Sequence, residues 1–126
     1  MINQPKDWLE QADYDYETAL YMFQGDRYVY AVFLCHLAIE KALKGLVLKA
    51  SNIQPPKTHS LIQLTKKAGL NPPENIGHFL VNLDQASIPT RYPEDLTTVK
   101  KIYTKDKTEE ILSKTKEILT WLKKMS

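Results

Sequence analysis

An arginine, a tyrosine and a proline follow one another in the stretch TRYPEDL, residues 90–96, which joins two segments expected to be helical. The guanidinium group of Arg91 carries its hydrogen-bond donors in a fork that matches the oxygens of a phosphate group. The ring of Tyr92 offers a flat face on which a base can stack. Arg91 and Tyr92 are therefore the first candidates for ligand contacts. The sequence leaves open that Arg91 is only a structural anchor in a connecting loop.

A second group of charged side chains, Glu40, Lys41 and Lys44, lies within the apolar stretch AIEKALKGL. Glu40 and Lys44 are four residues apart in the acid-first order, so on a helix they share a face and can form an ion pair. On an exposed surface such a pair contributes only roughly 0.2–0.5 kcal/mol. Charges in so apolar a segment often face an interface or a cleft instead. Glu40, Lys41 and Lys44 are therefore further candidates for ligand contacts.

Two histidines could take part in the same chemistry. His36 precedes Glu40 by one helical turn, which would place an imidazole beside a carboxylate. A core or interface position satisfied by one hydrogen bond is the simpler interpretation of His36. His59 follows Thr58, which we predict to be the N-cap of a short helix. Packing at that helix start and a ligand-binding role both remain open for His59.

Other familiar chemistries lack the residues that they need. The three histidines show no short metal-ligand spacing, and the single cysteine, Cys35, permits neither an intrachain disulfide nor a zinc cluster. We predict no metal and no cofactor, and we expect Cys35 to be a small buried residue. Neither GxGxxG nor GxxxxGK[ST] occurs, so nucleotide binding would have to use arginine, lysine and aromatic side chains.

Apolar residues at steps of three and four predict helices along most of the chain, and no segment alternates as a half-buried strand would. The expected helices span residues 6–23, 26–51, 59–68, a segment that opens near residue 71, and 106–124. Residues 88–105 are predicted to be irregular apart from a helical turn at 96–102. Gly45, inside the second helix, is expected to let a neighbouring helix approach closely. The predicted fold class is all-α, an up-and-down antiparallel bundle of four to five helices.

Length and charge indicate one ordinary globular domain. The chain has 126 residues, of which 43% are hydrophobic and 25% charged, with a net charge of +2. Its charge is unevenly distributed, since residues 1–26 carry six acids and one base whereas residues 41–67 carry six lysines and no acid. This asymmetry suits an anionic ligand or self-association, although solvated helix faces are the simpler explanation. No apolar run approaches roughly 18 residues, and no signal peptide is visible, so we expect a cytoplasmic protein without a membrane segment.

Four stretches, taken in order, resemble the HEPN domain family. They are A..DY..A (Ala12 to Ala19), AVFLCHLAIEKALKGL (Ala31 to Leu46), PPKTHSLIQL (Pro55 to Leu64) and RYP (Arg91 to Pro93). The resemblance covers nearly the whole chain and implies a single HEPN-like helical bundle domain over residues 1–126. It also implies a homodimer, and for stand-alone prokaryotic members a minimal nucleotidyltransferase partner in a toxin–antitoxin pair.

Many HEPN proteins are metal-independent ribonucleases whose signature is an arginine followed, after roughly four to six residues, by a histidine. The chain departs from this signature, because no histidine follows Arg91 and none occurs after His78. The leading hypothesis is therefore a binding module for nucleotide or RNA. One alternative is a ribonuclease whose base is displaced to His59 or His36. The other is a non-catalytic module that docks a partner protein.

Overall fold

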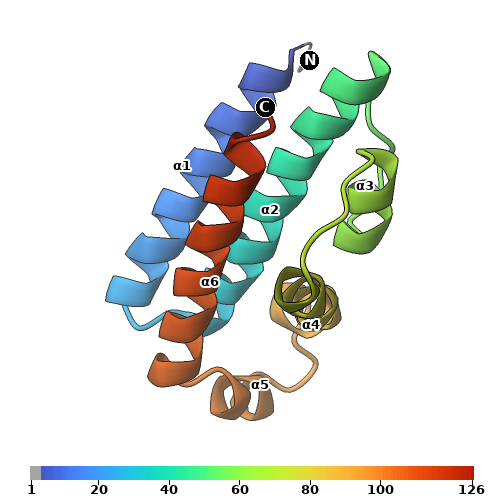
Figure 1. The fold of residues 1–126 in the computed structure, drawn as a ribbon. Helices are drawn as coiled ribbons and strands as arrows, with labels where there is room; N and C mark the ends of the chain where they lie inside the picture. The colour runs from blue at the N-terminus through green and yellow to red at the C-terminus, as the bar shows by residue number, and fades with distance from the viewer. Residues whose placement is uncertain (1–3) are drawn as a thin grey trace.

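Six α-helices make up the part of the chain that the computed structural model describes, residues 4–126 (Figure 1). They are α1 (Pro5–Gln24), α2 (Tyr28–Ser51), α3 (Leu61–Lys67), α4 (Glu74–Arg91), α5 (Leu96–Ile102) and α6 (Lys105–Lys123). Within those residues there is no strand, so the predicted all-α bundle is confirmed, with six helices in place of four or five. None of these helices is both long and apolar enough to cross a membrane.

Helices α1, α2 and α6 lie side by side and form the long axis of the molecule (Figure 1). Helix α1 runs opposite to α2 and α6. Helix α4 crosses beside α2, and α3 lies beside the C-terminal half of α2. Helix α2 is central: fifteen of its residues are buried, and it contacts every other helix. A helix that is apolar on nearly all sides is stable only where neighbours surround it, which explains this position.

One continuous core joins the helices. Ala12 and Ala19 of α1, Leu61 of α3, Leu80 of α4 and Val99 of α5 belong to the same buried cluster as residues of α2 and α6. Polar contacts across the three long helices add to it, since Lys41 of α2 pairs with Asp15 at 2.9 Å and Lys123 of α6 pairs with Asp13 at 2.6 Å. This core holds α2 rigid, and α2 carries most of the candidate residues.

Helix α4 continues further than predicted and runs through Pro89 to Arg91. The expectation that residues 88–91 are irregular was therefore wrong. Pro89 cannot donate a backbone hydrogen bond, which normally ends a helix. Thr90, fully buried, donates its hydroxyl to the Ala86 carbonyl at 2.7 Å, and the Tyr92 amide still bonds Ile88 at 2.9 Å. The burial of Thr90 and these two hydrogen bonds thus outweigh the proline.

Candidate functional site

Helix α2 presents a stripe of four side chains, each of which meets a group from another part of the chain. The stripe consists of Phe33, His36, Glu40 and Lys44, at steps of three, four and four residues, so that all four share one face of the helix. Along the stripe the partners are, in turn, a guanidinium group, a carboxylate, an imidazole and an indole ring. We call this set the α2 stripe.

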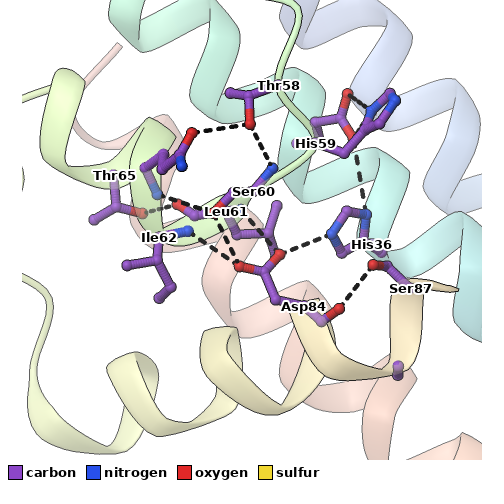
Figure 2. Close-up of polar contacts among 12 residues, drawn as sticks. His36, Thr58, His59, Ser60, Leu61, Ile62, Thr65, Asp84 and Ser87 are labelled. Atoms are coloured by element: carbon purple, nitrogen blue, oxygen red, sulfur yellow. Dashed lines mark hydrogen bonds and ion pairs between the residues drawn. The ribbon is translucent and has the colours of Figure 1, made fainter.

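Asp84 of α4 binds the α2 stripe and the start of α3 together (Figure 2). Its Oδ1 lies 3.0 Å from Nε2 of His36 and accepts the Leu61 amide at 2.9 Å. Its Oδ2 accepts the Ile62 amide at 3.3 Å and the Ser60 hydroxyl at 3.4 Å. The Asp84 carboxylate therefore accepts hydrogen bonds from two backbone amides at the N-terminus of α3, which have no partner within their own helix.

These contacts change the acidity of Asp84. Partial burial raises the pKa of the carboxyl, but the hydrogen bond from His36 and those from the Leu61 and Ile62 amides lower it more. The pKa of Asp84 consequently lies below its usual value. The group is a carboxylate at neutral pH and acts only as an acceptor, so Nε2 of His36 carries the proton in their hydrogen bond.

His36 is wholly enclosed. Its exposed fraction is 0%, and its second ring nitrogen, Nδ1, faces Oε1 of Glu40 at 3.8 Å, which is beyond hydrogen-bond distance. Within residues 4–126 this nitrogen has no hydrogen-bond partner. Because no surface of the ring is open, His36 cannot touch a ligand directly, and its contacts are those of a residue that positions Glu40 and Asp84.

Glu40 is the centre of the polar group, because it contacts both Lys44 and His59. Its side chain is 4% exposed, and its Oε2 accepts a hydrogen bond from Lys44 at 3.0 Å. The predicted pair of Glu40 and Lys44 therefore forms, buried instead of on an exposed surface. Both carboxylate oxygens also lie 3.1 Å from Nδ1 of His59. A buried carboxylate flanked in this way by a cation and an imidazole fixes the orientation of both.

His59 is the exposed member of the group. Its side chain is 59% exposed, and its Nε2 makes no hydrogen bond within the described residues. His59 precedes α3, which begins at Leu61, so the predicted N-cap at Thr58 was wrong: Ser60 takes that position and accepts the Gln63 amide at 3.2 Å. Asp84 explains the later start, because it requires the Leu61 and Ile62 amides to point at α4.

The two lysines predicted as contacts lie in different surroundings. Lys44 is buried and holds its ammonium 5.8 Å above the ring of Trp8, in addition to its bond with Glu40. Lys41 points away from this group and pairs with Asp15 of α1 at 2.9 Å. The structure therefore brings Glu40, Lys44 and His59 together and leaves Lys41 outside.

Arg91 ends α4 and lies against the first residue of the α2 stripe. Its guanidinium carbon is 4.7 Å from the centre of the Phe33 ring, a stacked cation–π contact. Arg91 forms no ion pair with any acid of residues 4–126, and one of its terminal nitrogens is buried without a hydrogen-bond partner. Tyr92 follows with 73% of its surface exposed. Arg91 and Asp84 are seven residues apart on α4, so they share the face turned toward α2.

The remaining reactive residues are not part of this site. Cys35 is fully buried, and burial raises the pKa of its thiol to about 12, although a hydrogen bond with Thr115 opposes the shift. A thiol in this state is no nucleophile at neutral pH. His78 is exposed and pairs with Glu74 at 3.5 Å. No group of three metal-binding side chains forms within residues 4–126.

Two residues of the site were missed from the sequence. Asp84 follows Leu80 by four residues and Leu83 by one, so the sequence could have placed it on the buried side of a helix. A carboxylate in such a position needs hydrogen-bond partners, and this could have been predicted. Phe33 gave no signal, because nothing in the sequence links it to Arg91.

A helical bundle of this kind also occurs in known proteins. The sequence profile of the HEPN domain matches residues 5–125. The crystal structure of TT1696 from Thermus thermophilus is similar, with a TM-score of 0.85 and 31% identity over 99% of this chain and 100% of that one. So is the crystal structure of ST0689, an archaeal HEPN homologue, with a TM-score of 0.78 and 32% identity over the same shares. No curated protein matches. The chain belongs to the HEPN domain family.

Proposed function

We propose that this HEPN protein binds a nucleotide or an RNA phosphate group at Arg91 and Tyr92. The observation that carries the proposal is the state of Arg91: its cation is fixed on the Phe33 ring and has no carboxylate partner within residues 4–126. An arginine that only anchors a fold usually pairs with an acid, because a partly buried charge is costly without one. A bound phosphate would supply the missing anion, and the exposed Tyr92 ring would supply a stacking surface for the base.

Binding is tested by titrating the four nucleoside monophosphates and a short single-stranded RNA against the wild type, Arg91→Ala and Arg27→Ala. Arg27 is an exposed arginine outside the site and gives the matched control for the loss of one charge. We expect Arg91→Ala to weaken binding by roughly ten- to a hundredfold, the equivalent of about 1.5–3 kcal/mol for a charged hydrogen bond. Arg27→Ala should change it little. No binding by the wild type, or equal binding by all three proteins, contradicts the proposal.

A second candidate function, a metal-independent ribonuclease, is favoured by the geometry of His59 and Glu40. A buried carboxylate that holds Nδ1 of an exposed histidine leaves Nε2 free to accept a proton, which is the arrangement of a general base and its orienting acid. Nε2 would take the proton of an RNA 2′-hydroxyl, whose oxygen then attacks the adjacent phosphorus. The bond from phosphorus to the 5′ oxygen breaks, and that oxygen takes a proton from water. Of the two displaced bases considered above, His36 is too enclosed to act.

The ribonuclease candidate predicts that RNA is cleaved in the presence of a chelator and that 2′,3′-cyclic phosphate ends accumulate. Cleavage should be lost in His59→Ala and retained in Arg27→Ala, which removes an exposed side chain that lies outside both the site and the pocket described below. Intact RNA after prolonged incubation with the wild type rejects this candidate without affecting the binding proposal.

We also propose that the protein forms a homodimer and that it works beside a minimal nucleotidyltransferase, as toxin and antitoxin. Exposed apolar side chains on α4 support the dimer: Val81 and Ile88, seven residues apart on one face, are 43% and 72% exposed. Surface apolar residues grouped in this way are typical of interaction sites. Support for the nucleotidyltransferase is membership of the family alone, and co-purification of the two proteins after joint expression tests it.

A further inference from the structure

A pocket of about 580 Å³ lies between α4 and α6, on a different part of the molecule from the α2 stripe. Helix α5 is at the end of α6 that lies nearest α4 (Figure 1), and Ile102 and Tyr103 from that segment line the pocket as well. Its volume falls within the range of small-molecule sites, about 300–1,000 Å³. None of its lining residues takes part in the contacts of Arg91, Glu40 or His59 described above.

The α4 wall of the pocket is polar but mostly uncharged. Asn75, His78, Asn82 and Gln85 recur at steps of three and four, so they form one exposed row along the helix. Within residues 4–126 the three carboxamide groups make no side-chain hydrogen bonds. Each carboxamide can therefore offer a donor and an acceptor to a ligand at the same time.

The α6 wall carries charge. Lys107, Glu110 and Lys114 also recur at steps of three and four, and none of them forms an ion pair within the described part of the chain. Between the two walls the floor is apolar, with Leu83 and Ile111 buried. An apolar floor flanked by a few free polar groups is the usual composition of a ligand site.

We propose that this pocket binds a nucleotide, either free or as an unpaired residue of an RNA. Carboxamides at Asn82 and Gln85 match the paired donor and acceptor on the edge of a base. Lys107 and Lys114 provide cations for the phosphate, and Glu110 between them accepts from a sugar hydroxyl or a base amine. The inference rests on the proposed function and adds a second contact site to it, separate from Arg91.

The test uses the intact protein with three probes: the nucleoside monophosphates, a short single-stranded RNA and inorganic phosphate. The pocket variant is Lys107→Gln with Lys114→Gln. Its matched control is Lys66→Gln with Lys67→Gln, which removes two exposed lysines from α3, outside the pocket. Circular dichroism confirms that each variant keeps its helices. A further variant, Asn82→Ala with Gln85→Ala, examines base recognition while leaving the charge unchanged.

We expect the pocket lysine variant to bind nucleotide or RNA at least tenfold more weakly than the α3 control. The carboxamide variant should lose the preference among the four bases. Preference for monophosphates identifies a free nucleotide as the ligand, and preference for RNA identifies a strand. Equal loss in both lysine variants, binding of inorganic phosphate alone, or no effect of either pocket variant overturns the inference. A wild type that binds none of the probes rejects the proposed function itself, whereas a loss confined to Arg91→Ala rejects only the pocket.

Discussion

Asp84 has an architectural role that is distinct from ligand binding. It joins α2 and α4 to the first turn of α3, through His36 on one side and the Leu61 and Ile62 amides on the other. A carboxylate at a helix N-terminus is favoured both by these hydrogen bonds and by the helix dipole. The exposed His59, two residues before α3, depends on this placement for its distance from Glu40.

Replacing Asp84 tests that role. Asp84→Asn keeps the shape of the side chain but removes the charge and one acceptor, so we expect the free energy of unfolding to fall by about 1–3 kcal/mol. The pKa of Asp84 is lowered in the folded state, so its stabilisation is present above the ordinary aspartate value of 3.8 and is lost as the pH falls through the folded value. Urea unfolding at pH 6 and pH 3 measures both effects.

A suitable control for Asp84→Asn is Glu94→Gln, which neutralises an exposed acid that forms no ion pair within residues 4–126. The difference in stability between wild type and Asp84→Asn should be large at pH 6 and should shrink at pH 3. A difference that stays constant between these two values would show that the Asp84 charge is not what stabilises α3.

At this scale the sequence predicts contacts within one helix and fails for contacts between helices. The pairing of Glu40 and Lys44 follows from their spacing alone, and the structure contains it. The contact of Glu40 with His59 joins residues 19 apart, and that of His36 with Asp84 joins residues 48 apart. Residues so far apart in the sequence come into contact only through the packing of whole helices, which cannot be predicted from one sequence.

The elements pack closely where α1 meets α2. A Cβ atom added at Gly45 would lie 3.0 Å from Cβ of Trp8 and 3.1 Å from the Pro5 carbonyl oxygen. Gly45 therefore permits the first turn of α1 to approach α2, as its position inside a helix suggested. The same approach brings Trp8 near Lys44 and so supports the C-terminal end of the α2 stripe.

Gly45→Ala should destabilise the protein although alanine is the better helix former. Alanine gains about 0.8–1 kcal/mol of helix propensity, but overpacking against a backbone carbonyl costs roughly 1–3 kcal/mol. Gly77→Ala in α4 is the matched control, because a Cβ there meets nothing within 4 Å. Thermal unfolding should give a lower melting temperature for Gly45→Ala and an equal or higher one for Gly77→Ala. A rise in both would mean that α1 and α2 have room to separate.

Helix positions were predictable from the sequence because periodicity depends on local spacing, as in α1, α2 and α6. The end of α4 was not, because Pro89 signals a break and only the burial of Thr90 reverses it. The consequence for function is direct. Arg91 belongs to a helix that faces α2, and a flexible loop would not have held it on Phe33.

For the whole molecule, we expect a homodimer that uses the outer face of α4. Ile88→Asp places a charge on the exposed face formed by Val81 and Ile88. Light scattering after size-exclusion chromatography should show a dimer for the wild type and a monomer for Ile88→Asp. Ile53→Asp is the control, because Ile53 is also exposed, at 69%, but lies in the loop after α2. A wild-type monomer, or a dimer that survives Ile88→Asp, contradicts this use of α4.

The hydrogen bonds that hold α3 in place also affect the stage of synthesis and folding at which this helix can form. Its seven residues are fewer than the roughly 12–15 that a helix needs to persist alone in water. The carboxylate that bonds its first amide lies 23 residues downstream. A chain emerging from the ribosome thus exposes Leu61 and Leu64, both fully buried in the finished fold, until α4 has been made. We therefore expect α3 to be completed late, after α2 and α4 have met, and the polar group around Glu40 to assemble at that step.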